Sequence, residues 1–249
     1  MSWTITGTQK VGDPHWSNVS LLLHGNGTNG SQSIIDSSPS PKTMTAVGNA
    51  QINTTITDPF GRTGVGVLAF DGNGDYFSTP ANSGFDLGAG DFTIEAWVRL
   101  AAHPSSYAGS FAAAIIGQSS DTSLGWFFGI AGNASQNINL VLTHGVSTQT
   151  TIGGTANLAL NTWYHMAAVR SGNTIYVYLN GNLTNGSGTS YTQTVKSSTT
   201  TLKVGALDYD MTYKYWLNGQ IDDLRITKGV ARYTANFTPP TAPFPDPVP

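Results

Sequence analysis

The chain has 249 residues with a formal net charge of −3, and only 10% of its residues are charged. A chain of this length can bury a sizeable core as a single β-sandwich domain, and its weak negative charge excludes nucleic-acid binding by electrostatics. The absence of cysteine excludes disulfides, zinc–thiolate sites and cysteine nucleophiles, and no apolar run reaches the roughly 18 residues of a membrane span.

The predicted elements are short strands separated by turns that are rich in Gly, Asn, Asp and Ser. The first strand is predicted at residues 19–24, where apolar residues occupy both faces. Further strands are predicted within the segments 43–52, 65–80, 91–100, 113–118, 124–130, 137–144, 161–184, 202–207 and 219–227. The segments 65–80 and 161–184 place turn residues between apolar runs, which predicts hairpins.

About a dozen short strands and no long amphipathic helix predict an all-β fold, an antiparallel β-sandwich or jelly roll. Residues 1–17 are predicted to form an N-terminal arm, and residues 18–235 the single domain. The tail at residues 236–249 is too rich in proline for a strand, so we expect an extended segment or a linker.

The sequence GQIDDLRITKG, residues 219–229, places two aspartates side by side in the last predicted strand. By strand alternation, Asp222 shares the apolar face of Leu224, whereas Asp223 shares a face with Arg225. We therefore expect Asp222 to point inward and Asp223 to form an exposed ion pair with Arg225, although Ile221 breaks the pattern by sharing the face of Asp223. An inward carboxylate needs a cation or several hydrogen-bond donors.

Six segments in a fixed order resemble a known family: SLLLHGNG, IIDSSPSPKTMTAVGNAQI, LAFDGNGDYFSTP, GDFTIEAWVRL, NTWYHMAAVRSGNTIYVYLNG and GQIDDLRITKGVARYTANFTPP. Together they resemble a laminin-G-like jelly-roll domain of the concanavalin A-like lectin/glucanase superfamily, over residues 19–240. The sequences of the segments are similar to those of such domains in tailed bacteriophage virion proteins. The resemblance implies two curved antiparallel sheets, and in many members a bound glycan or a calcium ion at the sandwich edge.

A calcium site is predicted from oxygen-bearing side chains in the first loops and the last strand, because calcium prefers oxygen ligands. The candidate ligands are Asn26, Asp36 and Asp222, with backbone carbonyls from residues 37–42. The resemblance implies a metal or structural ligand at Asp222, and many similar sequences have Asp at the position of Asn26. The alternative is that Asp36 and Asp222 organise loops by accepting backbone hydrogen bonds.

Catalysis is not expected, and no residue is predicted to be catalytic. Retaining glucanases need two carboxylates about 5–5.5 Å apart, but Glu95 is the only glutamate in the chain and its neighbours in TIEAWVRL include no aspartate. Glu95 is expected to pair with Arg99 or Arg170, or to face a concave surface. The hydrolase alternative would need a second carboxylate within reach of Glu95.

Sugar binding is predicted in residues 206–216, because aromatic rings stack on sugar faces and Asp and Asn bind hydroxyls. The predicted ligand-binding residues are Asp208, Tyr209, Asp210, Tyr213, Tyr215 and Trp216. The alternative is that Trp216 and one tyrosine fill the core while the other rings cover loop surface.

The resulting prediction is a non-enzymatic recognition module on a phage or virion surface that binds a host surface glycan, with calcium as the candidate cofactor. Without a basic and apolar leader in MSWTITGTQK, we expect an extracellular or virion location reached without a classical signal peptide. The alternative is a structural decoration or assembly protein of a capsid, tail or fibre, which contacts other virion chains and forms a homo-oligomer in the particle.

Overall fold

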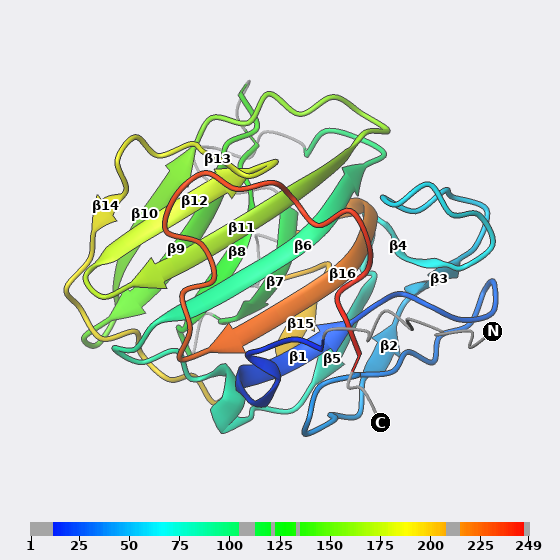
Figure 1. Ribbon diagram of the computed structural model, residues 1–249. Coiled ribbons are helices and arrows are strands. Elements are labelled where there is room, and N and C mark those ends of the chain that lie inside the picture. Colours follow the sequence, from blue (N-terminus) through cyan, green and yellow to red (C-terminus); the bar gives the residue numbers. More distant parts are fainter. Residues whose placement is uncertain (1–11, 105–112, 121–122, 133–134, 208–214, 247–249) are drawn as a thin grey trace, which may run out of the picture.

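Two antiparallel sheets pack face to face in the computed structural model, which describes residues 12–104, 113–120, 123–132, 135–207 and 215–246 (Figure 1). The predicted all-β sandwich is confirmed, with 16 strands in the described residues. Two short 3-10 helices, η1 (Trp16–Asn18) and η2 (Ser83–Phe85), complete the regular elements there. No helix among the described residues has the length and apolar character to cross a bilayer.

The larger sheet has nine strands in the order β13-β12-β11-β6-β16-β4-β3, with β1 beside β16 and β14 beside β12. Its strands are β1 (Val19–Leu23), β3 (Gln51–Asn53), β4 (Val67–Asp71), β6 (Phe92–Leu100), β11 (Trp163–Ser171), β12 (Thr174–Leu179), β13 (Asn182–Leu183), β14 (Thr189–Ser190) and β16 (Asn218–Lys228). The long strand β16 lies at its centre, between β6 on one side and β1 and β4 on the other.

The smaller sheet has seven strands in the order β10-β9-β8-β7-β15-β5-β2. Its strands are β2 (Thr45–Val47), β5 (Tyr76–Thr79), β7 (Ala113–Gln118), β8 (Trp126–Ile130), β9 (Ile138–His144), β10 (Thr148–Gly154) and β15 (Leu202–Val204). Apolar residues that alternate along the strands of both sheets fill the space between them, as Ile94 does from β6 and Phe128 from β8.

The predicted hairpin at residues 65–80 is wrong. Strand β4 belongs to the nine-stranded sheet and β5 to the seven-stranded sheet, so the turn between them passes from one sheet to the other. Gly72 and Gly74 do adopt the positive φ angles that a tight turn needs, but each strand finds its partners elsewhere. The predicted hairpins of residues 161–184 are confirmed, since β12 pairs with both β11 and β13.

A β-bulge in β16 overturns the predicted inward direction of Asp222, and the predicted exposure of Asp223 is also wrong. Asp222 lies opposite Trp97 and Arg225 opposite Glu95, so two residues of β16 face a single residue of β6. Asp223 has a φ of 47°, and the extra residue breaks the alternation on which the prediction rested. Asp222 therefore lies on the outer face beside Trp97, and Asp223 is 1% exposed instead of lying in solvent.

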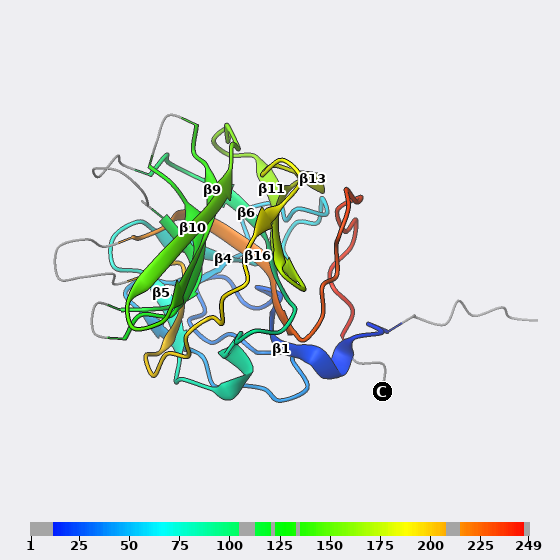
Figure 2. The same ribbon diagram turned by 90° about the vertical axis from the view of Figure 1, so that its left-hand side faces the viewer.

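The outer face of the nine-stranded sheet is covered by chain from both ends of the described structure. The segment 230–246, in orange to red, runs across β16, β6 and β11 on the side away from the other sheet (Figures 1 and 2). Residues 236–246 contain neither helix nor strand, as expected, yet Phe244 is only 5% exposed and packs with Trp16, Val19 and Leu22. The described part of the tail thus belongs to the folded unit.

Candidate functional site

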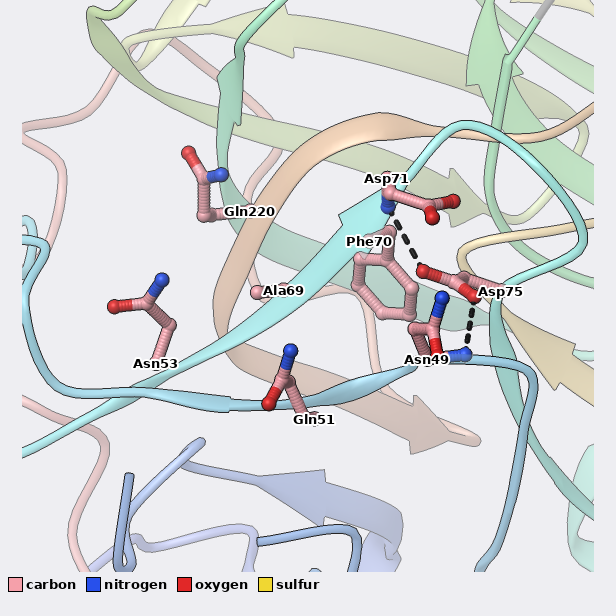
Figure 3. A pocket seen from close by; sticks show the side chains of 8 residues that line it. All are labelled: Asn49, Gln51, Asn53, Ala69, Phe70, Asp71, Asp75 and Gln220. Atoms are coloured by element: carbon pink, nitrogen blue, oxygen red, sulfur yellow. Dashed lines mark hydrogen bonds between the residues drawn. The ribbon is translucent and has the colours of Figure 1, made fainter. Parts of the chain in front are cut away.

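A pocket of about 340 Å³ lies over β3, β4 and β16 on the outer face of the large sheet (Figure 3). Its lining residues are Asn49, Gln51, Asn53, Ala69, Phe70, Asp71, Asp75 and Gln220. Carboxamides of Gln51, Asn53 and Gln220 surround Ala69, while the two aspartates lie at the opposite end with Asn49. The pocket is thus lined mainly by groups that can both donate and accept hydrogen bonds.

The floor of the pocket is set by strand register. Gln51 pairs with Ala69, and Ala69 pairs with Gln220, so the three residues form one row across β3, β4 and β16. Paired residues project from the same face, and neighbouring strands lie about 4.8 Å apart. A methyl group therefore lies between two long carboxamides whose Cα atoms are about 10 Å apart, which leaves a slot above Ala69.

Two of the carboxamides are already oriented by neighbouring groups. Gln220 Oε1 accepts a hydrogen bond from Arg99 Nη1 at 2.5 Å. Asn53 Oδ1 accepts from the backbone N–H and hydroxyl of Thr55, both at 2.8 Å. With the oxygen atoms engaged, the NH₂ groups of Gln220 and Asn53 remain as hydrogen-bond donors.

The other end of the pocket is held by Asp75, which links two turns. Its Oδ1 accepts from the backbone N–H of Asn49 at 2.5 Å and its Oδ2 from that of Asp71 at 2.9 Å. Burial, with the neighbouring carboxyl group of Asp71, raises the pKa of Asp75, although these two backbone donors oppose the shift. Asp71 is exposed, and its Oδ1 accepts from the backbone N–H of Asn73 at 2.8 Å. Asp75 is therefore a structural anchor, and Asp71 is the carboxylate at the pocket rim.

Glu95 lies elsewhere on the outer face, in a buried ion network beneath the C-terminal segment. Arg225 donates to Glu95 Oε1 from both Nε and Nη2, at 3.0 and 2.7 Å, and the hydroxyl of Tyr233 donates to Oε2 at 2.8 Å. The expected pairing of Glu95 with Arg99 or Arg170 is therefore wrong. Burial alone would raise the pKa of Glu95, but the charge of Arg225 and the contact with His165 lower it to about 2.

This environment is unsuited to glycoside hydrolysis. A general acid needs a carboxyl group with a raised pKa, whereas Glu95 is ionised and fully buried. The other acidic member of the network, Asp13, is joined to Glu95 through two arginines: Arg225 donates to Asp13 Oδ2 at 2.9 Å, and Arg232 lies 2.6 Å from Asp13 Oδ2 and 3.8 Å from Glu95 Oε1. Arg225 thus lies where a catalytic pair of carboxylates would need a substrate.

Asp223 anchors the C-terminal segment to the sheet. Its Oδ1 lies 2.5 Å from His24 Nδ1, and its Oδ2 accepts from the backbone N–H of Phe244 at 2.6 Å. Burial would lower the pKa of His24, but the hydrogen bond and charge of Asp223, together with Asp246, raise it above its usual value. The predicted exposed pair of Asp223 with Arg225 is replaced by a buried pair of Asp223 with His24.

The three predicted calcium ligands have different environments. Asp36 accepts four hydrogen bonds, from the backbone N–H groups of Leu22, Ser38 and Lys42 and from the Ser38 hydroxyl, so the alternative role of loop organiser is confirmed for it. Asn26 is exposed in the loop after β1. No group of three His, Cys, Asp or Glu residues that could hold a metal occurs in the described part of the chain. Calcium binding stays a prediction.

Asp222 is a buried carboxyl group with one orphaned oxygen. Its Oδ1 accepts from the backbone N–H of Asp223 at 2.9 Å, whereas Oδ2 has no hydrogen-bond partner among the described residues. Burial, with the nearby charge of Asp223, raises the pKa of Asp222 to about 9. At neutral pH this side chain is therefore held in its uncharged form.

Two of the six predicted sugar-binding residues can be placed. Asp208, Tyr209, Asp210 and Tyr213 lie outside the described residues. The ring of Tyr215 stacks on Phe127, with centroids 6.3 Å apart, at an apolar cluster of the small sheet, and Trp216 is half-buried. Sugar binding by this segment stays a prediction.

The sequence reasoning missed the pocket above Ala69. Its lining comes from three separate stretches of the chain, and amide side chains in strands form no recognisable sequence motif. The available signal was the alternation of Gln51 and Asn53 on one face of a short strand. Only the register of β3, β4 and β16 brings these groups to one place.

Comparison with known proteins gives one family match and several structural ones. A family model described as the concanavalin A-like lectin/glucanases superfamily matches residues 71–232. No curated protein matches the sequence. The binding domain of Paraclostridial Mosquitocidal Protein 1 has a similar structure, with 14% identity and a TM-score of 0.63 over 88% of this chain and 50% of that one.

Two similar structures were solved with sugars. The binding domain of botulinum neurotoxin DC in complex with SialylT has 16% identity and a TM-score of 0.58, over 86% of this chain and 49% of that one. Domain 4 of AbnA, an extracellular arabinanase from Geobacillus stearothermophilus, in complex with arabinotriose, has 17% identity and a TM-score of 0.59, over 86% of this chain and 95% of that one. The chain spans about half of each toxin binding domain, and identities this low establish the fold alone.

Proposed function

Because this chain belongs to the concanavalin A-like lectin/glucanases superfamily, we propose that it is a non-enzymatic carbohydrate-binding module and that the pocket above Ala69 holds the sugar. The observation that carries the proposal is the row of Gln51, Ala69 and Gln220, in which two carboxamides flank a methyl floor. Adjacent sugar hydroxyls both donate and accept hydrogen bonds, and a carboxamide can also do both.

The proposal agrees with what the pocket still offers to a ligand. The side-chain amides of Asn49 and Gln51 make no hydrogen bond within the described structure, and the NH₂ groups of Gln220 and Asn53 remain available as donors. Two neighbours of the same fold were solved with sialyl and arabinose oligosaccharides, which supports a carbohydrate as the ligand class. Glu95, the single glutamate, is occupied by Arg225 and Tyr233, which supports binding without hydrolysis.

The virion setting is part of the proposal and rests on the resemblance of the six sequence segments to phage virion proteins. There the module would hold a host surface glycan. The alternative, a decoration protein that docks on other virion chains through its arm and tail, is less favoured. The described parts of both ends are engaged by the chain itself, since Arg225 and Arg232 hold Asp13, and Phe244 is buried.

A glycan array tests the proposal. We expect the purified chain to bind at least one glycan class and Ala69→Val to lose that binding, because the larger side chain fills the slot while β-branching suits a strand. Gln51→Ala should weaken binding by about twofold to tenfold, the net value of one hydrogen bond. Thr151→Val, on an exposed position of β10 in the other sheet, is the matched control and should bind as the wild type does.

The outcomes separate the site from the function. Loss of binding in Tyr215→Ala or Trp216→Ala, with full binding by Ala69→Val, would move the sugar to the aromatic segment and refute the pocket. Binding to no glycan by the folded wild-type chain would refute the carbohydrate-binding proposal. Circular dichroism of each variant shows whether a loss of binding reflects a loss of fold.

A further inference from the structure

The charged residues that line the pocket above Ala69 are all acidic. Two of the eight lining residues, Asp71 and Asp75, carry carboxyl groups, and none is Lys, Arg or His. Asp75 is 1% exposed and has both oxygens engaged by backbone donors. Asp71 is exposed, so its negative charge is the one that a ligand entering the pocket meets.

The position of Asp71 relative to the slot follows from strand geometry. Asp71 is two residues beyond Ala69 on β4, so both side chains project from the same face, with Cα atoms about 7 Å apart. The hydrogen bond from the backbone N–H of Asn73 to Asp71 Oδ1, at 2.8 Å, holds the carboxylate at the rim. A sugar above Ala69 would therefore lie next to a fixed negative charge.

The nearest positive charge in the same row, on Arg99, does not cancel the negative charge of Asp71. Arg99 follows Gln220 in the row, one strand farther from the slot, on β6. Its guanidinium donates to Gln220 Oε1 at 2.5 Å and is not among the lining groups. Arg99 orients the Gln220 amide, and the pocket itself keeps its negative character.

We infer that this pocket selects neutral sugars against anionic ones, such as sialylated or uronic acid glycans, and that Asp71 is the residue that sets the selectivity. The inference rests on the proposed function and adds to it the chemical class of the ligand. A carboxylate on a sugar above Ala69 would be repelled by Asp71 and would find donors only in neutral amides.

The expected discrimination follows from the separation of the charges. With the Ala69–Asp71 Cα spacing of about 7 Å taken as the charge separation, two like charges lower an association constant by about threefold in a water-like medium, and by about fiftyfold at the effective dielectric constant near a protein surface. We therefore expect anionic glycans to bind between about threefold and about fiftyfold more weakly than their neutral counterparts. The difference should shrink at 1 M salt, where the Debye length is about 3 Å.

The test uses an array of neutral glycans, each printed beside its sialylated or uronic acid counterpart, with the full chain and two variants. Asp71→Asn keeps an oxygen for the Asn73 N–H but removes the charge, so it should bring the binding of paired glycans closer together. Asp86→Asn makes the same change in net charge at the C-terminal end of η2, and it should leave the ratio unchanged.

Equal or stronger binding of the anionic member of a pair by the wild-type chain would overturn the inference and leave carbohydrate binding intact. The same holds if Asp71→Asn and Asp86→Asn show the same neutral-to-anionic ratio as the wild type. Binding to neither member of any pair would instead refute the proposed function, and the inference would fall with it. A preference for neutral glycans that Asp71→Asn reduces is the result we expect.

Discussion

The buried carboxyl group of Asp222 leads to a prediction in which an apparently conservative change stabilises the protein. Asp222 is 1% exposed, its Oδ2 has no hydrogen-bond partner within the described structure, and its pKa is raised to about 9. The substitution Asp222→Asn replaces a neutral carboxyl group with a neutral amide of the same shape. The amide oxygen can still accept the hydrogen bond from the backbone N–H of Asp223.

The magnitude follows from proton linkage. Between the ordinary pKa of 3.8 and the raised value of about 9, the folded chain holds a proton on Asp222 that the unfolded chain releases. The free energy of unfolding therefore falls by about 1.4 kcal/mol for each pH unit in that window, which amounts to about 4 kcal/mol at pH 7. Asp222→Asn avoids this loss and should raise Tm by about 10 °C at pH 7 in a chain of this size.

Urea unfolding of wild-type chain and variant at pH 5, 6, 7 and 8 measures the effect. We expect Asp222→Asn to be the more stable protein, by a margin that grows with pH. Asp223→Asn is the matched control and should destabilise, because Asp223 is the buried partner of His24 and of the Phe244 N–H. A difference in the free energy of unfolding between Asp222→Asn and the wild-type chain that does not change with pH would refute the reasoning. A variant that is less stable only in calcium would show that Asp222 ligates the ion, as the sequence predicts.

Two further predictions concern the segments that cover the large sheet. Glu95→Gln should lower the free energy of unfolding in urea by about 3–5 kcal/mol, because Arg225 is left buried without its countercharge. The wild-type chain should lose this stabilisation as the pH falls from 4.5 toward 2, the lowered pKa of Glu95, and an unchanged stability of Glu95→Gln would contradict the network. The raised pKa of His24 means that its ion pair with Asp223 is lost as the pH rises from the ordinary histidine pKa of 6.5 through the higher value in the folded chain. Protease cleavage within residues 238–246 should therefore accelerate between pH 6 and pH 9, and an equal rate at both pH values would contradict this anchoring role.

Local sequence patterns predict much of the sandwich. The segment DFTIEAWVRL alternates cleanly, and it forms β6 with Ile94 and its even-numbered neighbours in the core. Turn residues at 171–173 and 180–181 predicted two real hairpins. The turn at 71–75 has equally strong local signals but connects two sheets, because pairing is decided by which strands lie beside β4 and β5 in the whole fold.

The errors at the candidate sites share one cause, which is their dependence on contacts distant in sequence. The bulge in β16 is not marked by glycine, since Asp223 itself takes the positive φ, and a parity argument without the bulge gives the wrong face for Asp222 and the wrong exposure for Asp223. The partner of Glu95 comes from β16, 130 residues away. Likewise, Gln51 and Gln220 are neighbours only because both pair with Ala69 of β4, and no local sequence pattern predicts this pairing.

The most direct test of the central claim is a crystal structure of the chain with the neutral glycan that binds best on the array. The account predicts a sugar ring in the slot above Ala69, within hydrogen-bond distance of Gln51 and Gln220, with Asp71 at its rim. A sugar bound elsewhere, for example on the outer face of the small sheet beside Phe127 and Tyr215 with the slot above Ala69 empty, would contradict it.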